Sequence, residues 1–386
     1  MEVRILNRGM VAALAALAYA ALSGFAFAGS DQPPIKIGFF SPQTGFGAPD
    51  GRSALAGAQL AIKQVNDADG IDGHKLELVP YDDGSDPKQG ATIATKLTSQ
   101  DGVVAAVSGS YSPQTLAAAT IFQRAKTVLV SAYAVNPGIP KAGSYIFLQD
   151  VNGTVQGRAG AKFLADKGIK KPAVISIDND FGNALVQGFV AEAPKLGMTV
   201  VSTDKNQFGE KDFGTIIRRV IASGADAIYL VQYVAEGKQF LRDWAQADGK
   251  LTLFSTEGID SAGFYSIGKL ADGLMFTTNL NRDSKSEETR QFLSDFAKAY
   301  DFPVDMVAAS SHDAVMLVVD SMRKNGTTAA DVKAGLDALR DFKGATGTIE
   351  RFTDQGEVIK PVQVQVFNDG KISSAGVVSD PAIITP

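Results

Sequence analysis

The sequence predicts an α/β protein built from two doubly wound lobes, each with a mostly parallel sheet. Short apolar segments alternate with amphipathic segments of helical period from residue 34 onward. Strands that alternate with helices form parallel sheets covered by helices. The alternation restarts near Pro172 and occupies most of the 386 residues, which is more than one sheet of ordinary size accommodates.

The first run of this pattern predicts the elements of one lobe. Leu55, Ala58, Ile62 and Val65 recur at helical spacing, and Asp86 before Pro87 is typical of a helix start. Helices are expected at Ser53–Ala68, from Pro87 onward and at about Pro113–Arg124. The intervening apolar or alternating segments predict the strands Pro34–Phe40, Lys75–Asp82, Val103–Ser108 and Thr127–Ala132.

The second run repeats the pattern and predicts a second lobe. Its strands are expected at Ala173–Asp178, Thr199–Thr203, Asp226–Tyr233 and Leu251–Glu257. The helices between them are expected at Asn183–Leu196, Asp212–Ala222 and Ala235–Ala247.

The last quarter predicts helices at Ser284–Tyr300, Ala308–Lys324 and Asp331–Leu339. The segment Val362–Phe367 then alternates strictly and ends in the hairpin turn signal of residues 368–371. We therefore expect the tail to return to one lobe as an added strand.

The N-terminus has the pattern of a secretory signal peptide. Arg4 and Arg8 precede an apolar run from Met10 to about Leu22, and residues 26–28 form an A-x-A cleavage pattern. Cleavage near Ala28 is expected; an uncleaved membrane anchor is the alternative, because residues 9–28 are nearly long enough to cross a bilayer.

Composition excludes several classes of function. The chain has no cysteine, so it has neither disulfides nor a lipidated N-terminal cysteine, and an exported chain of this kind is expected in a bacterial periplasm without a lipid anchor. The net charge of −5 gives no electrostatic footprint for nucleic acid or anionic lipid. With only two histidines, His74 and His312, no metal site is expected, and no cofactor.

A ligand is expected beyond the carboxyl ends of the parallel strands. The strand-to-helix loops there offer amide N–H groups for a carboxylate, together with hydroxyl and carboxylate groups for an ammonium. These loops are Ser41–Arg52, Ser108–Pro113, Ala132–Pro137, Asp178–Gly182, Tyr233–Gly237 and Glu257–Ser261. No nucleophile elbow, phosphate loop or acid/base pair stands out, so no catalytic residue is assigned.

Each candidate also has a purely structural interpretation. Ser112 before Pro113 is compatible with a helix cap, Tyr133 and Tyr233 with packing aromatics, and Glu257 with a cap of the next segment. The acids of residues 82–83 and 178–180 are typical of turns.

Several segments resemble the leucine/isoleucine/valine-binding proteins of bacterial ABC importers. The most specific is Gly57–Leu97, and the others are Ser131–Pro137, Asp178–Gly182, Gly209–Phe213 and Thr256–Gly258. The resemblance implies the periplasmic-binding-protein type I fold, in which two α/β lobes are joined by three crossover strands. It implies lobe 1 at residues 29–149 plus 280–358 and lobe 2 at 150–279 plus 359–386.

The resemblance also implies roles for individual residues. Ser112 corresponds to the serine that binds the ligand carboxylate, and Tyr133 falls where a family backbone group does the same. Glu257 corresponds to the acid that binds an ammonium, and Phe181 and Tyr233 correspond to aromatics of the cleft. The family's disulfide positions are occupied here by Ser85 and Tyr111.

Other positions depart from the family pattern. Val135 stands where a ligand-binding threonine is usual, and Asp50 replaces an aromatic near the side-chain pocket. Leu148 replaces an arginine, Gly153 replaces an aspartate, and Arg282 falls near a family aromatic. These changes alter the expected polarity of the pocket. The expected ligand-binding residues are Asp50, Ser112, Tyr133, Val135, Phe181, Tyr233 and Glu257.

The sequence therefore favours a monomeric, non-catalytic periplasmic protein that captures a small branched-chain-like amino acid and delivers it to an ABC permease in the inner membrane. An aromatic or other organic carboxylate, or an amide, is the alternative ligand. A sensor that signals to a membrane receptor and a secreted hydrolase are the alternative functions.

Overall fold

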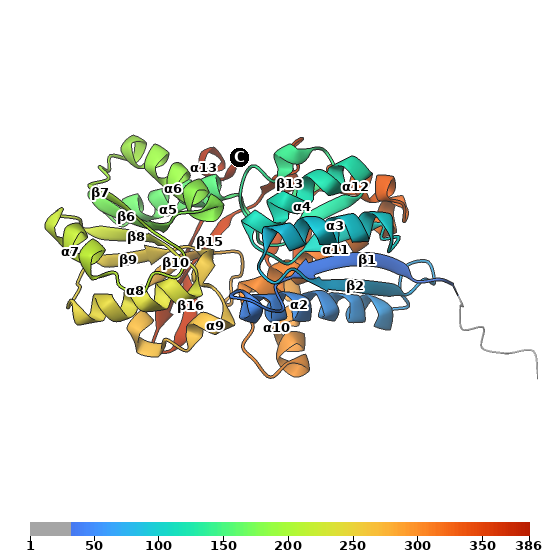
Figure 1. The fold of residues 1–386 in the computed structure, drawn as a ribbon, viewed down its shortest axis with the longest axis horizontal. Helices are drawn as coiled ribbons and strands as arrows, with labels where there is room; N and C mark the ends of the chain where they lie inside the picture. Colours follow the sequence, from blue (N-terminus) through green and yellow to red (C-terminus); the bar gives the residue numbers. More distant parts are fainter. Residues whose placement is uncertain (1–31) are drawn as a thin grey trace, which may run out of the picture.

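The computed structural model describes residues 32–386, and the expected signal peptide of residues 1–28 lies outside them. Within these residues the main strands form two sheets, which lie side by side with their helices as two lobes (Figure 1). We call the part around the five-stranded sheet lobe 1 and the part around the seven-stranded sheet lobe 2. The expected division into two parallel-sheet lobes is therefore confirmed, while the residue boundaries given above stay a prediction.

The sheet of lobe 1 is parallel throughout, in the order β2-β1-β3-β4-β5. Its strands are β1 (Ile35–Ser41), β2 (Leu76–Asp82), β3 (Ala105–Ser108), β4 (Val128–Ser131) and β5 (Ile146–Leu148). Its helices are α2 (Ala48–Asp67), α3 (Pro87–Ser99) and α4 (Ser112–Ala125), joined by α10 (Glu287–Ala299), α11 (Met306–Asn325) and α12 (Ala329–Asp337). Helix α11 packs closely on α2 at Gly57. A Cβ there would lie 2.0 Å from the carbonyl oxygen of Ala308, so this approach requires a glycine.

The sheet of lobe 2 has the order β16-β15-β10-β9-β8-β6-β7 and is parallel from β10 to β7. Those strands are β6 (Pro172–Ile177), β7 (Ser202–Asn206), β8 (Ala227–Val231), β9 (Thr252–Ser255) and β10 (Met275–Thr278). The tail adds β15 (Val362–Asn368) and β16 (Lys371–Val378) as an antiparallel hairpin, as expected from the sequence. The helices are α5 (Gly153–Asp166), α6 (Asp180–Glu192), α7 (Gly214–Ala222), α8 (Val234–Gln246), α9 (Ala262–Tyr265) and α13 (Pro381–Ile384).

The chain passes between the two sheets at three places within residues 32–386: after β5, after β10 and before β15. Side chains tie these passages together. Asn279 donates from Nδ2 to Oε1 of Gln149 over 2.9 Å, and Lys360 donates from Nζ to Oδ1 of Asn279 over 2.6 Å. Small pairs, β11 (Phe342–Gly344) with β12 (Gly347–Ile349) and β13 (Arg351–Phe352) with β14 (Val358–Ile359), precede the last passage.

The clearest difference from the sequence prediction is α5, which was not expected. Gly153, Gly157 and Gly160 weaken its helical signal. The structure explains at least one of these glycines, because a Cβ at Gly157 would lie 2.1 Å from the carbonyl oxygen of Leu185 on α6. Strands β5 and β10 were also missed, and the strand expected at Thr199–Thr203 begins only at Ser202. Among residues 32–386, no helix combines the length and the apolar character that crossing a bilayer requires.

Candidate functional site

A small cavity of about 20 Å³, roughly the room that one water molecule needs, lies between the lobes, at the carboxyl ends of their parallel strands. Loops that follow β3 and β4 line it from lobe 1, and loops that follow β6, β8 and β9 line it from lobe 2. This is the edge at which open parallel sheets bind ligands. The lining residues are Asp50, Tyr111, Ser112, Tyr133, Met306 and Val307 of lobe 1 and Phe181, Tyr233, Glu257, Gly258 and Ser261 of lobe 2.

The structure brings together most of the residues expected from the sequence. Six of the seven line this cavity, and only Val135, which is fully buried, is not among the lining side chains. That the six bind a ligand stays a prediction, as does a role for Val135. Tyr111 and Ser261 were missed although their loops had been selected, because no pattern distinguished them within those loops. Met306 and Val307 were missed because they begin a helix, α11, rather than follow a strand.

The lobe 1 side of the cavity is suited to an anion. Ser112 is the first residue of the 14-residue helix α4, where the amide N–H groups of the first turn have no acceptor within the helix. Its hydroxyl oxygen accepts a bond from the amide of Asn136 over 3.3 Å. The lining residues include no Lys, Arg or His, so the helix terminus and the hydroxyl groups are what this cavity offers to a carboxylate.

The lobe 2 side carries Glu257, which begins a short 3₁₀ helix, η3 (Glu257–Ile259). Its side chain is 3% exposed, and Oε2 accepts a bond from Nε2 of Gln156 on α5 over 2.7 Å. Burial raises the pKa of Glu257 well above its ordinary value, and the nearby Asp150 raises it further. The cavity therefore presents a carboxyl group opposite the start of a helix.

Asp50, in the first turn of α2, links the two lobes. Its carboxylate accepts a bond from the hydroxyl of Tyr111 over 2.6 Å and another from the hydroxyl of Ser261 in lobe 2. Burial raises the pKa of Asp50, while these two hydroxyl donors act in the opposite direction. Asp50 is thus a cavity carboxyl whose oxygens already have protein partners.

Aromatic rings from both lobes close the cavity. The rings of Tyr111 and Tyr233 lie 5.1 Å apart across the boundary, and Phe181 stacks on Tyr233 at 4.9 Å. Phe46 stacks on Tyr111 at 5.4 Å and contacts Phe208 of lobe 2 at 4.4 Å, so further rings cover the outer edge. The structure therefore shows the two lobes closed against one another.

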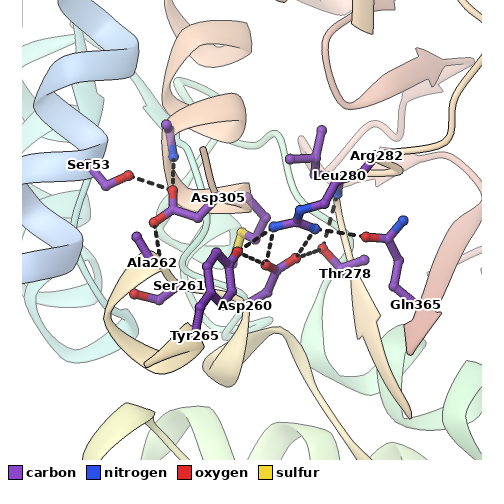
Figure 2. Close-up of polar contacts among 12 residues, drawn as sticks. Ser53, Asp260, Ser261, Ala262, Tyr265, Thr278, Leu280, Arg282, Asp305 and Gln365 are labelled. Carbon is purple, nitrogen blue, oxygen red and sulfur yellow. Dashed lines mark hydrogen bonds and ion pairs between the residues drawn. The ribbon is translucent and has the colours of Figure 1, made fainter. Parts of the chain in front are cut away.

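A second contact between the lobes lies beside the cavity (Figure 2). Asp305 caps α11 and accepts bonds from the Ser53 hydroxyl over 2.5 Å and from the Ala308 amide over 2.9 Å. It also accepts a bond from the amide of Ala262 in lobe 2 over 2.9 Å. Burial raises the pKa of Asp305 to about 7.

Arg282 does not change the polarity of the cavity, contrary to the expectation from the sequence. It lies outside the cavity lining, and its guanidinium pairs with both oxygens of Asp260 at 2.5 and 3.1 Å (Figure 2). It also donates to Oε1 of Gln365 over 2.8 Å. Its charge is therefore neutralised within lobe 2. Residues 32–386 contain no cluster of three or more acidic or histidine side chains with the arrangement of a metal site.

Comparison with known proteins identifies relatives over nearly the whole described chain. The family model described as periplasmic binding protein matches residues 34–371. The Leu/Ile/Val-binding protein homolog 3 of Brucella melitensis is 29% identical over 371 residues, which is 93% of this chain and 98% of that protein.

Solved structures have the same fold. The substrate-binding protein of a branched-chain amino acid transporter from Streptococcus pneumoniae, in complex with isoleucine, is 25% identical with a TM-score of 0.83, over 89% of this chain and 99% of that one. A solute-binding protein of an ABC transporter from R. palustris, in complex with benzoate, is 20% identical with a TM-score of 0.80, over 89% and 96% of the two chains. The second likeness bears on the fold alone. The chain therefore belongs to the periplasmic binding protein family, with the type I fold of the Leu/Ile/Val-binding proteins of ABC transporters.

Proposed function

We propose that this protein captures a small, branched-chain-like α-amino acid between its lobes and delivers it to an ABC permease in the inner membrane. In this proposal it acts as a monomer in the periplasm, after cleavage of its signal peptide near Ala28, without a lipid anchor or a cofactor, and catalyses no reaction. One observation carries the proposal: the cavity has the start of a helix on one side and a carboxyl group on the other.

These two sides match the two charges of an amino acid. The ligand carboxylate would accept bonds from the hydroxyl and the amide N–H of Ser112 at the start of α4, and the ligand ammonium would pair with Glu257. Met306, Val307 and Phe181 supply apolar surface for an aliphatic side chain. The names of the relatives from B. melitensis and S. pneumoniae support this class of ligand.

Delivery follows from the arrangement of the lobes. A ligand that contacts Ser112 and Glu257 at once binds the closed form more tightly than an open one, and so shifts the population toward closure. The three passages between the lobes would act as the hinge. The permease would then bind the closed protein.

An aromatic carboxylate is the second candidate ligand. The rings of Tyr111, Tyr133, Phe181 and Tyr233 surround much of the cavity, and a protonated Glu257 would donate a hydrogen bond to a ligand without an ammonium. The relative in complex with benzoate illustrates that the fold accommodates such compounds.

A thermal-shift screen of the mature protein separates these candidates. The panel contains L-leucine, L-isoleucine, L-valine, benzoate, 4-hydroxybenzoate and an aliphatic amide, and titration calorimetry follows each positive result. At a hundred times its dissociation constant, a true ligand stabilises the folded state by about 2.7 kcal/mol. Stabilisation by the amino acids supports the proposal, and stabilisation by the benzoates alone would replace it with the second candidate.

A further inference from the structure

The passage from lobe 1 to lobe 2 after β5 places a second carboxyl group behind Glu257. Asp150 is 2% exposed, and its Oδ1 accepts a bond from the amide of Val151 over 2.7 Å. Its other oxygen, Oδ2, has no hydrogen-bond donor among the described residues, and neither has Oε1 of Glu257. Nε2 of Gln156 donates both to Oε2 of Glu257 over 2.7 Å and to the carbonyl oxygen of Val151 over 2.9 Å, which brings Glu257 next to the backbone that follows Asp150. Each of the two carboxyl groups also acts on the pKa of the other. A proton between them would supply the missing donor to both.

Two ionised carboxylates in contact within a buried site are strongly unfavourable, so the surroundings decide whether the pair keeps a proton. The charge of Lys360, which is 1% exposed, acts on Asp150, but its Nζ donates to Asn279 and Thr346 over 2.6 and 2.8 Å. Burial lowers the pKa of Lys360 to about 8. One lysine of this kind balances one negative charge rather than two.

The remaining ionisable groups around the pair add no further positive charge. Asp260 also faces both carboxyls, but Arg282 pairs with it. Tyr229 lies near Glu257 and is buried and neutral, since burial raises its pKa. Asp313 shares Lys360 with the pair. Burial raises the pKa of both Asp150 and Glu257, and the charge of Asp150 raises that of Glu257 further, so the ligand-free pair keeps one proton at neutral pH.

We propose that Asp150 and Glu257 form one carboxyl–carboxylate unit with a single shared proton, which moves from Glu257 to Asp150 when an ammonium group enters the cavity. The proton travels along the hydrogen bond from Oε1 of Glu257 to Oδ2 of Asp150. The negative charge passes to Glu257, beside the ammonium, and the total charge of the unit stays at −1. Asp150 is thus a positioning residue that selects a ligand with one ammonium.

The inference rests on the proposed function, and it makes a distinctive prediction for binding. Because the proton stays within the unit, the heat of binding of L-leucine at pH 7 is expected to be equal in two buffers of different ionisation enthalpy. Release of one proton per L-leucine bound would overturn the transfer.

Substitution of Asp150 tests the role of the donor. In Asp150→Asn an amide N–H replaces the acid O–H toward Glu257, and we expect the dissociation constant for L-leucine to stay within about threefold. In Asp150→Ala that donor is lost, and about tenfold weaker binding is expected, the equivalent of one hydrogen bond to a buried charged group. The control Glu357→Gln, a half-buried acid that bonds Asn152 at the same passage, should bind like the wild type. Equal losses in Asp150→Asn and Asp150→Ala would overturn the proposal.

A measurement without ligand separates this proposal from the proposed function. In the folded state the unit keeps a proton that the unfolded chain releases. The unfolding free energy therefore falls as the pH rises toward the raised pKa of Glu257. Asp150→Asn removes the charge beside Glu257, so the pKa of Glu257 should be raised less. In urea titrations between pH 5 and 9, the decline of the unfolding free energy should then end at a lower pH. An unchanged pH profile would exclude the shared proton. If no member of the panel binds while the profile changes as expected, the proposed function fails and the carboxyl unit stands.

Discussion

The two lobes present carboxyl groups of opposite character to the same cavity. Asp50 of lobe 1 accepts hydroxyl donors on both oxygens, whereas Glu257 of lobe 2 has one ordinary donor and an oxygen that faces another acid. Both carboxyl groups are buried, so they differ in how many hydrogen-bond donors the protein already gives to each. A buried acid with its own donors holds structure together, and one without them is available to a ligand. We therefore propose that Asp50 serves closure of the lobes and that Glu257 serves the ligand.

The largest expected effect comes from Glu257→Ala. Removing one partner of a desolvated carboxylate–ammonium pair costs about 3–5 kcal/mol, so binding of an amino-acid ligand should weaken by roughly a hundredfold or more. Titration calorimetry with L-leucine measures this change, and circular dichroism verifies the fold. Unchanged affinity would remove Glu257 from the ligand site and end the contrast with Asp50.

Ser112→Ala tests the opposite side of the cavity. The variant keeps the first-turn amides of α4 but loses one hydroxyl toward a charged ligand group, so the dissociation constant should rise by roughly tenfold, the equivalent of about 1.5 kcal/mol. Thr92→Ala, which removes an exposed hydroxyl on α3, is a matched control. A loss as small as that of the control would indicate that Ser112 acts only as the start of its helix.

The same contrast explains how much of the site could be predicted from the sequence. Parallel-sheet topology places strand-end loops at one edge, so Ser112, Tyr133, Phe181, Tyr233 and Glu257 could be selected from their positions after strands. Asp150 follows the short strand β5, and the role proposed for it depends on Glu257, which comes from a distant segment of the chain. Met306 and Val307 come from a helix start that no strand signal marks. Contacts between distant segments therefore account for what was missed.

The prediction of the fold succeeded and failed for the same reason. Long strands and helices with clear periodicity were predicted close to their observed positions, as for Val362–Phe367 and β15. Helix α5 was missed because its glycines serve the packing on α6 rather than the local propensity of the helix. Local sequence pattern predicts most elements, but it misses those whose residues are required for packing against a segment that is distant in the sequence.

The second contact between the lobes should give a pH dependence. The pKa of Asp305 is raised to about 7 in the folded protein, chiefly by burial. The folded state therefore holds a proton that the unfolded chain releases, and the stability that this adds is present below about pH 4 and is lost as the pH rises to about 7. Asp305→Asn removes this group and should flatten the decline of the unfolding free energy over that range. Urea unfolding at several pH values tests this, and an unchanged slope would show that Asp305 does not hold the proton.

The smallest expected effect is that of Ser261→Ala, which removes the hydroxyl that bonds Asp50 across the lobes. Tyr111 still donates to the other oxygen of Asp50, so the folded lobe should be little changed. The variant also loses the cap of α9, in which Ser261 Oγ accepts from the amide of Gly263 within lobe 2. Only the closed form loses the bond to Asp50 as well, so binding of any ligand that needs closure should weaken by roughly threefold to tenfold, the equivalent of about 0.5–1.5 kcal/mol. Calorimetry with L-leucine measures this loss, and with Asp50→Ala and the double variant it completes a double-mutant cycle. Losses that simply add in the double variant would show that Asp50 and Ser261 act separately, and the assignment of Asp50 to closure would then be wrong.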